Sequence, residues 1–158
     1  MGFFIQQLED AKDLPLPQYM TEGAAGMDLC AHVHGELVIR PRQRVAVPCG
    51  FKMAMPTGYE AQIRPRSGLG LKHGISMPNA PGTIDADYRG EISVLLINHG
   101  DEDFVIRRGD RIAQMIINKI ERIDFQHVKD LPKSQRGDAG FGSTGLAQEK
   151  NLDKLGNI

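Results

Sequence analysis

Residues 51–64 read FKMAMPTGYEAQIR and consist of two alternating segments joined by a turn. Apolar side chains occupy every second position of residues 51–55, and they do so again in residues 59–63. An alternation with a period of two is typical of a half-buried β-strand. Proline followed by threonine and glycine at 56–58 is typical of a turn. The stretch therefore predicts two β-strands connected by a short turn.

The same pattern extends in both directions along the chain. Short apolar or alternating segments recur between turn signals, at residues 3–7, 37–39, 44–48, 92–98, 104–106 and 111–117. Cys49 and Gly50 are among the expected breaks between strands. Closely spaced turn signals favour a β-sandwich or barrel over units in which strands alternate with long helices. The sequence therefore predicts an all-β protein with one short helical turn at most.

Composition changes once along the chain, after Pro132. The next thirteen residues, 133–145, contain four glycines and few side chains that could pack into a core. Such a segment buries too little apolar area to offset the entropy of ordering it. We expect a β domain at residues 1–132, a mobile glycine-rich arm at 133–145 and a C-terminal tail at 146–158.

Length and charge exclude several classes of protein. The chain has 158 residues, the size of one domain, and its net charge is −1, from 19 Lys plus Arg and 20 Asp plus Glu. This balance argues against DNA, RNA or a membrane surface as a partner held by a bulk positive field. The first residues resemble no signal peptide, and Cys30 and Cys49 form no disulfide framework. We expect a cytoplasmic protein with two free thiols.

A candidate anion site lies at residues 64–70, which read RPRSGLG after a predicted strand. Arg66 offers a guanidinium that binds phosphate oxygens in pairs, and Ser67 and Gly68 offer a hydroxyl and backbone N–H groups. A helical turn opened by Ser67 would add its dipole to the site. The alternative is that these arginines are solvated surface residues.

Residues 79–91, NAPGTIDADYRGE, are the stretch richest in candidate functional groups. Turn residues at both ends predict a β-hairpin, which would place Asp85 and Asp87 on one face. A carboxylate on that face could orient and deprotonate a water molecule. The alternative is a hairpin tip whose charges serve solubility.

Three further segments contain polar groups among small residues. Asp28 lies in AAGMDL at 24–29, where it is either a ligand group or a turn residue bonded to local amides. In GDRIAQM at 109–115, Asp110 and Arg111 are expected to cap or pair structurally, whereas Gln114 could face a ligand. Residues 136–145, RGDAGFGSTG, lack the Gly-Lys-Ser/Thr of a Walker loop and are either a linker or a ligand-binding arm.

Two histidines give a weak indication of a zinc site. His32 and His34 lie close to Cys30, but the sequence has no second ligand pair at zinc-finger spacing. The sequence therefore favours a structural role for both histidines.

Five candidate segments have now been described, at residues 24–29, 64–70, 79–91, 109–115 and 136–145. In this order they resemble the five motifs of the trimeric dUTP pyrophosphatases, or dUTPases, and the resemblance spans residues 24–145. It implies a jelly-roll-like β-sandwich, also called a β-clip, and a homotrimer with active sites shared between subunits. It also implies Mg²⁺-assisted hydrolysis of dUTP to dUMP and pyrophosphate, which keeps uracil out of DNA and supplies dUMP for thymidylate synthesis.

The resemblance also implies a role for each candidate residue. Asp85 resembles the base that orders the attacking water, and Asp28 resembles a carboxylate near the metal and triphosphate, acting through water. The substrate-binding residues that it implies are Arg66, Ser67, Gly68, Asn79, Thr83, Ile84, Asp85, Tyr88, Gln114, Arg136, Phe141, Gly142, Ser143 and Thr144. Among them, Asn79 corresponds to uracil recognition, Tyr88 to packing under deoxyribose, and Phe141 to stacking on uracil.

Two alternatives share the expected fold. A dCTP deaminase would have a catalytic glutamate in the strand after the third motif, where this chain has Leu95. That family also lacks the Arg-Ser-Gly found here at 66–68. The second alternative is a non-catalytic regulator that binds dUTP. Release of pyrophosphate distinguishes the expected hydrolase from both alternatives.

Overall fold

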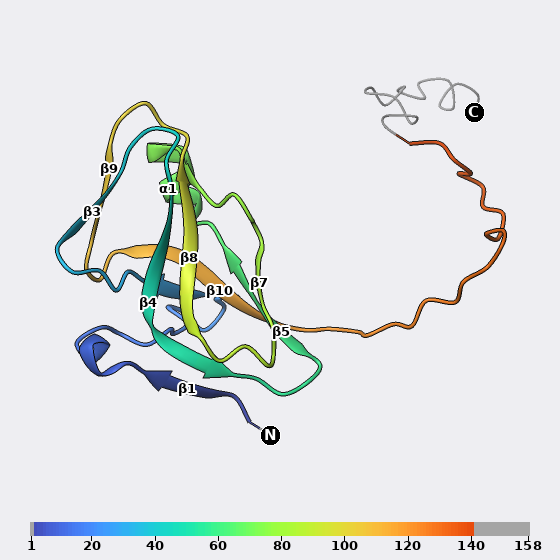
Figure 1. Ribbon diagram of the computed structural model, residues 1–158, viewed down its shortest axis with the longest axis horizontal. Coiled ribbons are helices and arrows are strands. Elements are labelled where there is room, and N and C mark those ends of the chain that lie inside the picture. Colours follow the sequence, from blue (N-terminus) through green and yellow to red (C-terminus); the bar gives the residue numbers. More distant parts are fainter. Residues whose placement is uncertain (1, 141–158) are drawn as a thin grey trace, which may run out of the picture. The chain divides into compact units, whose positions relative to one another are not determined.

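The computed structural model describes residues 2–140, and Figure 1 shows its ribbon. The chain divides into two units, Met1–Arg122 and Ile123–Ile158, and every strand and helix of the described residues belongs to the first. In chain order the elements are β1 (Phe4–Gln7), the 3₁₀ helix η1 (Glu9–Ala11), β2 (Met27–Cys30), β3 (Glu36–Ile39), β4 (Arg44–Ala54), β5 (Tyr59–Arg64), α1 (Ser67–His73), β6 (Ile75–Ser76), β7 (Gly82–Ile84), β8 (Glu91–Asn98), β9 (Phe104–Arg107) and β10 (Arg111–Lys119). The predicted all-β class is confirmed.

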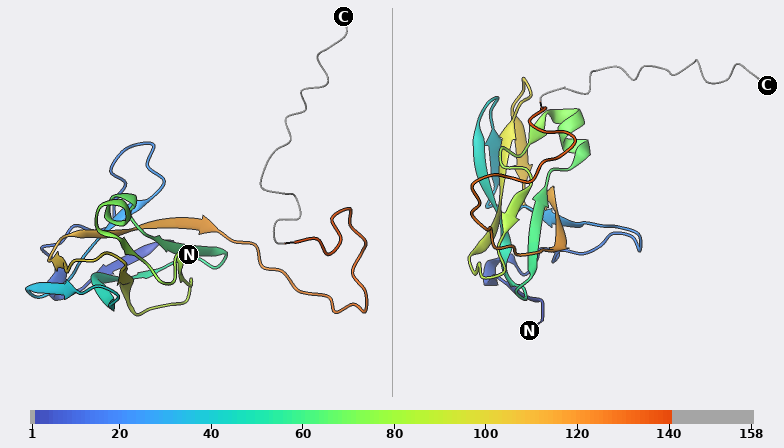
Figure 2. Two further views of the ribbon diagram at one scale, coloured as in Figure 1. Left: turned by 90° about the horizontal axis from the view of Figure 1, so that it is seen from above. Right: turned by 90° about the vertical axis from the view of Figure 1, so that its right-hand side faces the viewer.

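Two four-stranded antiparallel sheets form the body of the first unit (Figure 2). Their strand orders are β1-β4-β8-β6 and β2-β10-β5-β7, and β3 pairs with β9 in a separate two-stranded sheet. Buried side chains of both larger sheets, such as Leu96 of β8 and Ile63 of β5, belong to one hydrophobic core. Because the two inner faces share that core, the first unit is a β-sandwich.

The predicted break at Cys49 and Gly50 is wrong, because β4 continues through it as one strand. The pairing of β4 with β8 shifts register between Pro48 and Lys52, and Gly50 has φ +75°. Glycine tolerates this left-handed conformation, so the strand bends there without ending. A side chain at position 50 would also collide with Ala11, which lies against this bend.

The predicted hairpin at residues 79–91 is also wrong. β7 pairs with β5, whereas β8 pairs with β4 and β6 in the other sheet. The residues between them form a turn in which the Tyr88 N–H donates to the Asp85 carbonyl at 3.1 Å. Asp85 and Asp87 therefore do not share the face of an extended strand. The segment crosses between the sheets because each strand has a partner that is distant in sequence.

The helical turn expected at Ser67 is present as α1. Arg66 is its N-cap in extended conformation, and Gly74 ends the helix with φ 66°. A glycine in the left-handed region is a common helix end. A side chain at position 74 would also lie 2.6 Å from the backbone nitrogen of Gly100, which explains why the chain has glycine there.

In the second unit, residues 123–140 form no regular strand or helix. Arg136 lies in a turn, where its Nε donates to the Ala139 carbonyl at 2.8 Å. The Gly137 N–H donates to the Ser134 hydroxyl at 3.1 Å in the same turn. The predicted segment boundaries at 132 and 145 stay predictions. None of the helices within residues 2–140 has the length and apolar character needed to cross a lipid bilayer.

Candidate active site

The strand pairing of β10 positions the first group of candidate residues. Gln114 lies opposite Asp28 of β2 on one side and opposite Arg64 of β5 on the other. The chain leaves β5 at Arg64 and enters α1 at Ser67, after two intervening residues, so the start of this helix lies beside Gln114 and Asp28. These elements enclose a hollow of about 520 Å³ lined by Asp28, Arg66, Ser67, Gly68, Leu69, Lys72, His73 and Gln114.

Asp28 organises the charges in this hollow. One of its carboxylate oxygens lies 3.4 Å from the Arg66 Nε, and the other lies 3.0 Å from an Arg111 nitrogen. Arg66 also donates through Nη1 to the Arg111 carbonyl at 3.0 Å. Because one carboxylate faces two guanidiniums, the group keeps a net positive charge, and Arg66 is held in a defined position. Such an arrangement attracts an anion.

The Gln114 amide is held by a hydrogen bond to the backbone, and it occupies space beside Gly26, which has no side chain. Its Nε2 donates to the Pro65 carbonyl at 3.2 Å. A Cβ at Gly26 would lie 2.8 Å from the Gln114 Oε1, so a side chain there would displace this amide. Gln114 therefore lies beside Arg66 in the same hollow. Its amide lies between the start of β2 and the start of α1.

The expectation that Asp110 and Arg111 have structural roles is confirmed. The Asp110 carboxylate accepts from the Arg107 N–H at 2.7 Å and closes the turn before β10. Arg111 forms the ion pair with Asp28. The residues that sequence reasoning missed are Lys72 and His73, which line the same hollow from the last turn of α1. Only the exact extent of that short helix could have indicated them.

Two candidate residues of 79–91, Thr83 and Asp85, line a different hollow, of about 590 Å³, whereas Asn79, Ile84 and Tyr88 do not line it. Thr83, Asp85, Ala86 and Asp87 line it together with the β4–β5 turn and Arg122. Asp85 and Thr83 are exposed, and Ile84 is half-buried on β7. Asn79 precedes a cis peptide between Ala80 and Pro81 and lies against Gly82, where a Cβ would be 3.1 Å from its amide nitrogen.

Tyr88 is anchored at the edge of the turn. Its hydroxyl donates to the Glu91 carbonyl at 3.1 Å, and its ring covers Gly90, where a Cβ would collide with it. Arg89 donates to the carbonyls of Ala86 and Tyr88 at 2.7 and 2.8 Å. These contacts hold the tyrosine ring, which is 44% exposed, in one orientation toward solvent.

Asp85 and Arg66 lie at opposite ends of β5. Ile84 pairs with Ala61, so Asp85 leaves the sheet beside the start of β5, whereas Arg66 follows its end at Arg64. The four steps from residue 60 to residue 64 alone span roughly 13 Å at the rise of a β-strand. One copy of the chain therefore brings Asp28, Arg66, Ser67, Gly68 and Gln114 together but keeps Asp85 apart from them.

The remaining candidates belong to the second unit. Arg136 is exposed, and its turn is described above. Phe141, Gly142, Ser143 and Thr144 lie outside the described residues.

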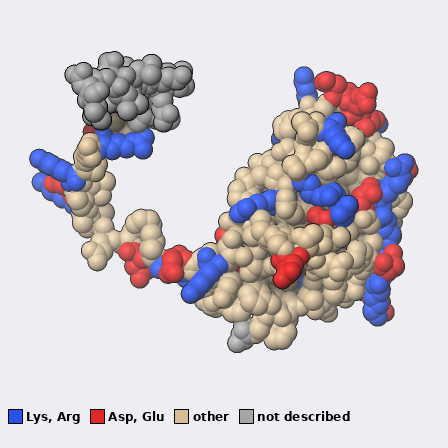
Figure 3. All heavy atoms as spheres, turned by 180° about the vertical axis from the view of Figure 1, so that it is seen from behind, with Lys and Arg blue, Asp and Glu red and all other residues tan. Residues whose placement is uncertain are grey.

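Charged side chains are mixed on the surface of the first unit. Figure 3 shows Lys and Arg side chains on one face with Asp and Glu side chains between them. The described site concentrates positive charge in one small hollow. A β-sandwich in which one carboxylate holds two arginines beside a hollow has the charge and geometry suited to a small anionic ligand.

Comparisons with known proteins specify the class further. The family model for dUTPase matches residues 12–145. Proteins named deoxyuridine 5'-triphosphate nucleotidohydrolase from Caldanaerobacter subterraneus subsp. tengcongensis and from Zymomonas mobilis subsp. mobilis are each 54% identical over 142 residues, which is 90% of this chain and 96% of theirs. The chain belongs to the dUTPase family.

Solved structures share the fold. A mutant dUTPase of Staphylococcus bacteriophage 80alpha, solved with dUpNHpp, has a TM-score of 0.81 at 23% identity, covering 91% of this chain and 98% of that chain. A mutant dUTPase from phage phi11 of S. aureus, studied for its coordination of a structural Mg(II) ion, has a TM-score of 0.73 at 19% identity, covering 84% of this chain and 100% of that chain. The predicted family and its β-sandwich fold are confirmed.

Proposed function

We propose that this protein hydrolyses dUTP to dUMP and pyrophosphate, which keeps uracil out of DNA and supplies dUMP for thymidylate synthesis. The observation that carries the proposal is the 54% identity to dUTP nucleotidohydrolases over nearly the whole length of those proteins. The arginine-lined hollow supports it, because a triphosphate is the anionic part of this substrate.

The phosphate groups bind at the start of α1. Arg66 contributes its guanidinium, held in place by Asp28, and Ser67 and Gly68 contribute a hydroxyl and the N–H groups of a first helical turn. Gln114 contributes its amide from β10. Positioning and charge neutralisation are the main demands of phosphoryl transfer, and these groups meet both.

Magnesium fits this set of residues only together with the substrate. Asp28 is the one carboxylate that lines the described hollow, and both of its oxygens already face guanidiniums. Mg²⁺ favours substrate phosphate oxygens and retained waters over an all-protein cage. When bound, it would neutralise charge on the phosphates, and Asp28 would hold it through water.

The nucleoside binds to residues 79–88. Asn79 reads the uracil edge, Thr83 and Ile84 of β7 form the adjoining wall, and the fixed ring of Tyr88 packs under deoxyribose. Asp85 orients a water molecule and takes its proton as the water oxygen attacks the α-phosphorus. The bond from that phosphorus to the bridging oxygen breaks, and pyrophosphate leaves.

Each active site is shared between subunits of a homotrimer. Asp85 and Arg66 act on the same triphosphate in this mechanism, but they lie at opposite ends of β5 within one chain. Two copies in contact remove this conflict, because one supplies Asp85 and Tyr88 while the other supplies Asp28, Arg66 and Gln114. The arm supplies Arg136, Phe141, Gly142, Ser143 and Thr144, with the arginine on phosphate and the phenylalanine on uracil.

A cytoplasmic location is part of the proposal. The two cysteines are free thiols, which fits a reducing compartment. No DNA, RNA or membrane partner is needed for the proposed reaction.

A substrate panel tests the proposed function. The purified chain is incubated with dUTP, UTP, dTTP and dCTP in the presence of Mg²⁺, and pyrophosphate and base identity are both measured. We expect pyrophosphate from dUTP at a rate at least about a hundredfold above dCTP, because buried polar groups discriminate strongly against a wrong edge, and about tenfold or more above UTP and dTTP, which shape alone must reject. Formation of dUTP from dCTP would identify a deaminase, and binding of dUTP without turnover would identify a regulator.

A further inference from the structure

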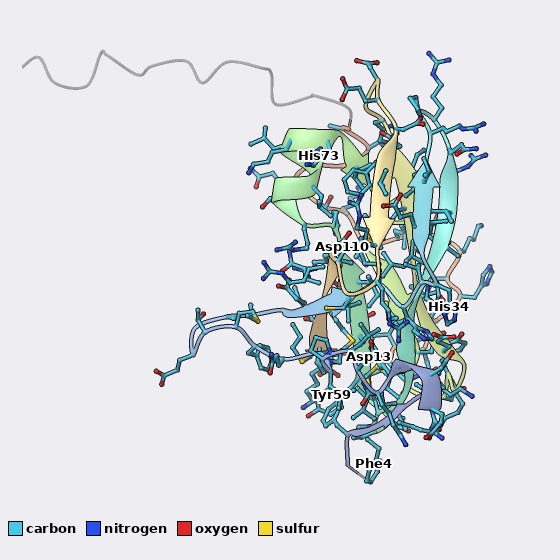
Figure 4. The ribbon with its side chains drawn as sticks, turned by 90° about the vertical axis from the view of Figure 1, so that its left-hand side faces the viewer. Phe4, Asp13, His34, Tyr59, His73 and Asp110 are labelled. Atoms are coloured by element: carbon cyan, nitrogen blue, oxygen red, sulfur yellow. The ribbon has the colours of Figure 1, made fainter. Side chains whose placement is uncertain are left out.

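A second cluster of ligand-type side chains lies outside the proposed active site. Asp10 of η1 meets His32 and His34, which follow β2, and one ligand atom from each residue lies within 4.8 Å of the other two. In Figure 4, His34 lies well away from His73, which marks α1 and the anion hollow. The fold thus supplies, from the N-terminal segment, the third ligand that the sequence around the histidines lacks.

The distances fit a tetrahedral metal ion. The His32 Nε2 lies 3.5 Å from the Asp10 Oδ2, and the His34 Nε2 lies 3.7 Å from the same oxygen. Imidazole and carboxylate ligands bind zinc at about 2.0–2.2 Å, so tetrahedral geometry separates the ligand atoms by about 3.4 Å. The ligand nitrogens of the two histidines lie within 4.8 Å of each other, so all three atoms would reach this spacing by rotation of the exposed Asp10 and His34 side chains.

The surroundings of His32 resemble the support that proteins give to a metal-binding imidazole. His32 is 6% exposed, and its Nδ1 lies 3.4 Å from the Glu91 Oε1, which also accepts from the Gly50 N–H at 2.9 Å. A carboxylate can only accept, so Nδ1 donates in this contact, and in the neutral ring this tautomer leaves the Nε2 lone pair for a metal ion. A carboxylate behind the imidazole is typical of metal sites, because it fixes the ring and its tautomer.

The Nε2 atom of His32 faces oxygen atoms. This nitrogen lies 3.3 Å from the Asp10 carbonyl and 3.5 Å from the Asp10 carboxylate, and both oxygens are acceptors. In the neutral ring these acceptors face the Nε2 lone pair, and a proton or a metal ion between them removes the repulsion. A metal ion bound to Nε2 and Oδ2 satisfies both groups.

The charged groups around Asp10, His32 and His34 add up to a net negative charge when both histidines are neutral. Arg108 donates to the Asp10 carbonyl at 2.6 Å and forms a two-pronged ion pair with Asp13. That ion pair lowers the pKa of the Asp13 carboxyl to about 2 and matches the charge of Arg108. The carboxylates of Asp10 and Glu91 remain beside the histidines.

We propose that Asp10, His32 and His34 bind one Zn²⁺ ion, with Glu91 as the carboxylate that orients His32. Two imidazoles and one carboxylate suit zinc, whereas magnesium prefers oxygen ligands throughout. The His34 side chain is 79% exposed, so the ion can enter from solvent. A water molecule would occupy the fourth coordination position. The ion ties η1 to the loop between β2 and β3, and this role is independent of nucleotide hydrolysis.

Zinc binding to the full chain tests the proposal directly. The protein is treated with a chelator, and Zn²⁺ is then titrated in competition with a chromophoric chelator, in buffer containing millimolar Mg²⁺. We expect one Zn²⁺ per chain that Mg²⁺ does not displace. His34→Gln, at an exposed position, should weaken binding at least about tenfold, and Glu91→Gln should weaken it by about 10–100-fold. His99→Gln, which changes another exposed histidine, should bind as the wild type does.

Thermal unfolding provides a second measurement. Zinc bound to the folded chain raises the midpoint temperature, and the rise grows with the ratio of free zinc to the dissociation constant. We expect a rise in the wild type and in His99→Gln, and little or none in His34→Gln or Asp10→Asn. Equal zinc affinity in the wild type and His34→Gln, or the absence of binding at micromolar zinc, would overturn the proposal.

Discussion

Asp85 and Asp87 provide an internal comparison at the scale of single residues. Both carboxylates are exposed in the same turn, and both line the same hollow. Only Asp85 is proposed to act as the base. We expect Asp85→Asn to lower dUTP turnover by roughly 10²–10⁴-fold while a non-hydrolysable dUTP analogue still binds, because the amide keeps the shape but takes no proton.

Asp87→Asn is the matched control for this prediction. It removes one negative charge from the same turn, and we expect turnover within about threefold of the wild type, as for an ordinary surface substitution. Steady-state release of pyrophosphate and calorimetric binding of the analogue measure the two properties. Equal losses in both variants would assign the effect to the charge of the turn, and wild-type turnover in Asp85→Asn would remove this residue from the mechanism.

Cys49 couples the stability of the core to alkaline pH. Burial raises the pKa of its thiol from 9.0 to about 12, so the folded state retains a proton that the unfolded state loses. The free energy of unfolding should therefore fall as the pH rises from 9 toward 12, by up to about 1.4 kcal/mol per pH unit from this group. Below pH 9 this contribution is fully present.

Cys49→Ala should show a shallower decline over that range. We expect it to start about 1 kcal/mol less stable at pH 7, because a small buried group is lost. Urea unfolding at pH 7 to 10.5 measures the difference between the variant and the wild type, which cancels the titration of other groups. Cys30→Ala is the control, since burial also raises that pKa but the site is only partly buried. Parallel curves for the wild type and Cys49→Ala would contradict the prediction.

At the scale of elements, the turn between β7 and β8 is built to hold one aromatic ring. Tyr88 donates to the Glu91 carbonyl and lies over Gly90. If this ring packs under deoxyribose, a ribose 2'-hydroxyl meets it and is rejected. We expect Tyr88→Ala to raise the relative kcat/KM for UTP over dUTP at least about tenfold, within the range that a shape contact supplies.

Tyr88→Phe separates the ring from its hydroxyl. It keeps the aromatic face and loses the hydrogen bond to Glu91, so discrimination against UTP should stay within about threefold of the wild type, since a hydrogen bond at an exposed position contributes little. The measurement is kcat/KM for UTP and dUTP with each variant. Unchanged discrimination in Tyr88→Ala would contradict the steric role, and relaxed discrimination in Tyr88→Phe would assign it to the hydroxyl.

The strands themselves show what a sequence reveals at this scale. The alternation at residues 51–55 and 59–63 is local, so it predicted strand segments that are present in β4 and β5, with Phe51, Met53, Ala61 and Ile63 buried. The pairing partners of β7 and β8 are distant in sequence, and the local pattern at residues 79–91 therefore suggested a hairpin that does not exist. Gly50 looked like a break because nothing local tells a bend within a strand from its end.

In the candidate site, too, the sequence indicated local motifs but not the contacts between residues that are distant in sequence. Resemblance to family motifs indicated Asp28, Arg66 and Gln114 together, and the structure places them around one hollow. The ion pair of Arg111 with Asp28 joins positions 83 residues apart, so the sequence predicted a structural role for Arg111 but not its partner. Asp10 beside His32 and His34 could not be predicted either, because the fold alone brings η1 to that loop.

At the scale of the whole molecule, the proposed mechanism needs more than one chain. Arg66 is tied to Asp28 and follows the end of β5, while Asp85 lies beside the start of that strand. A triphosphate is shorter than the intervening strand, which spans roughly 13 Å over four residues. A complete site therefore combines the Asp85 of one subunit with the Arg66 of another.

Two inactive variants should restore one another if the sites are shared. Asp85→Asn and Arg66→Ala are each expected to be nearly inactive alone. Mixed in equal amounts, unfolded together and refolded, they assemble at random, and about a quarter of the sites in closed oligomers combine an intact Asp85 with an intact Arg66 from a neighbour. We expect pyrophosphate release at about a quarter of the wild-type rate per chain. Mixing without unfolding is the control and should stay inactive on the time scale of the assay. Activity that stays at the level of the separate variants after refolding, while wild-type protein treated in the same way recovers, would place both residues in one subunit and contradict the shared site.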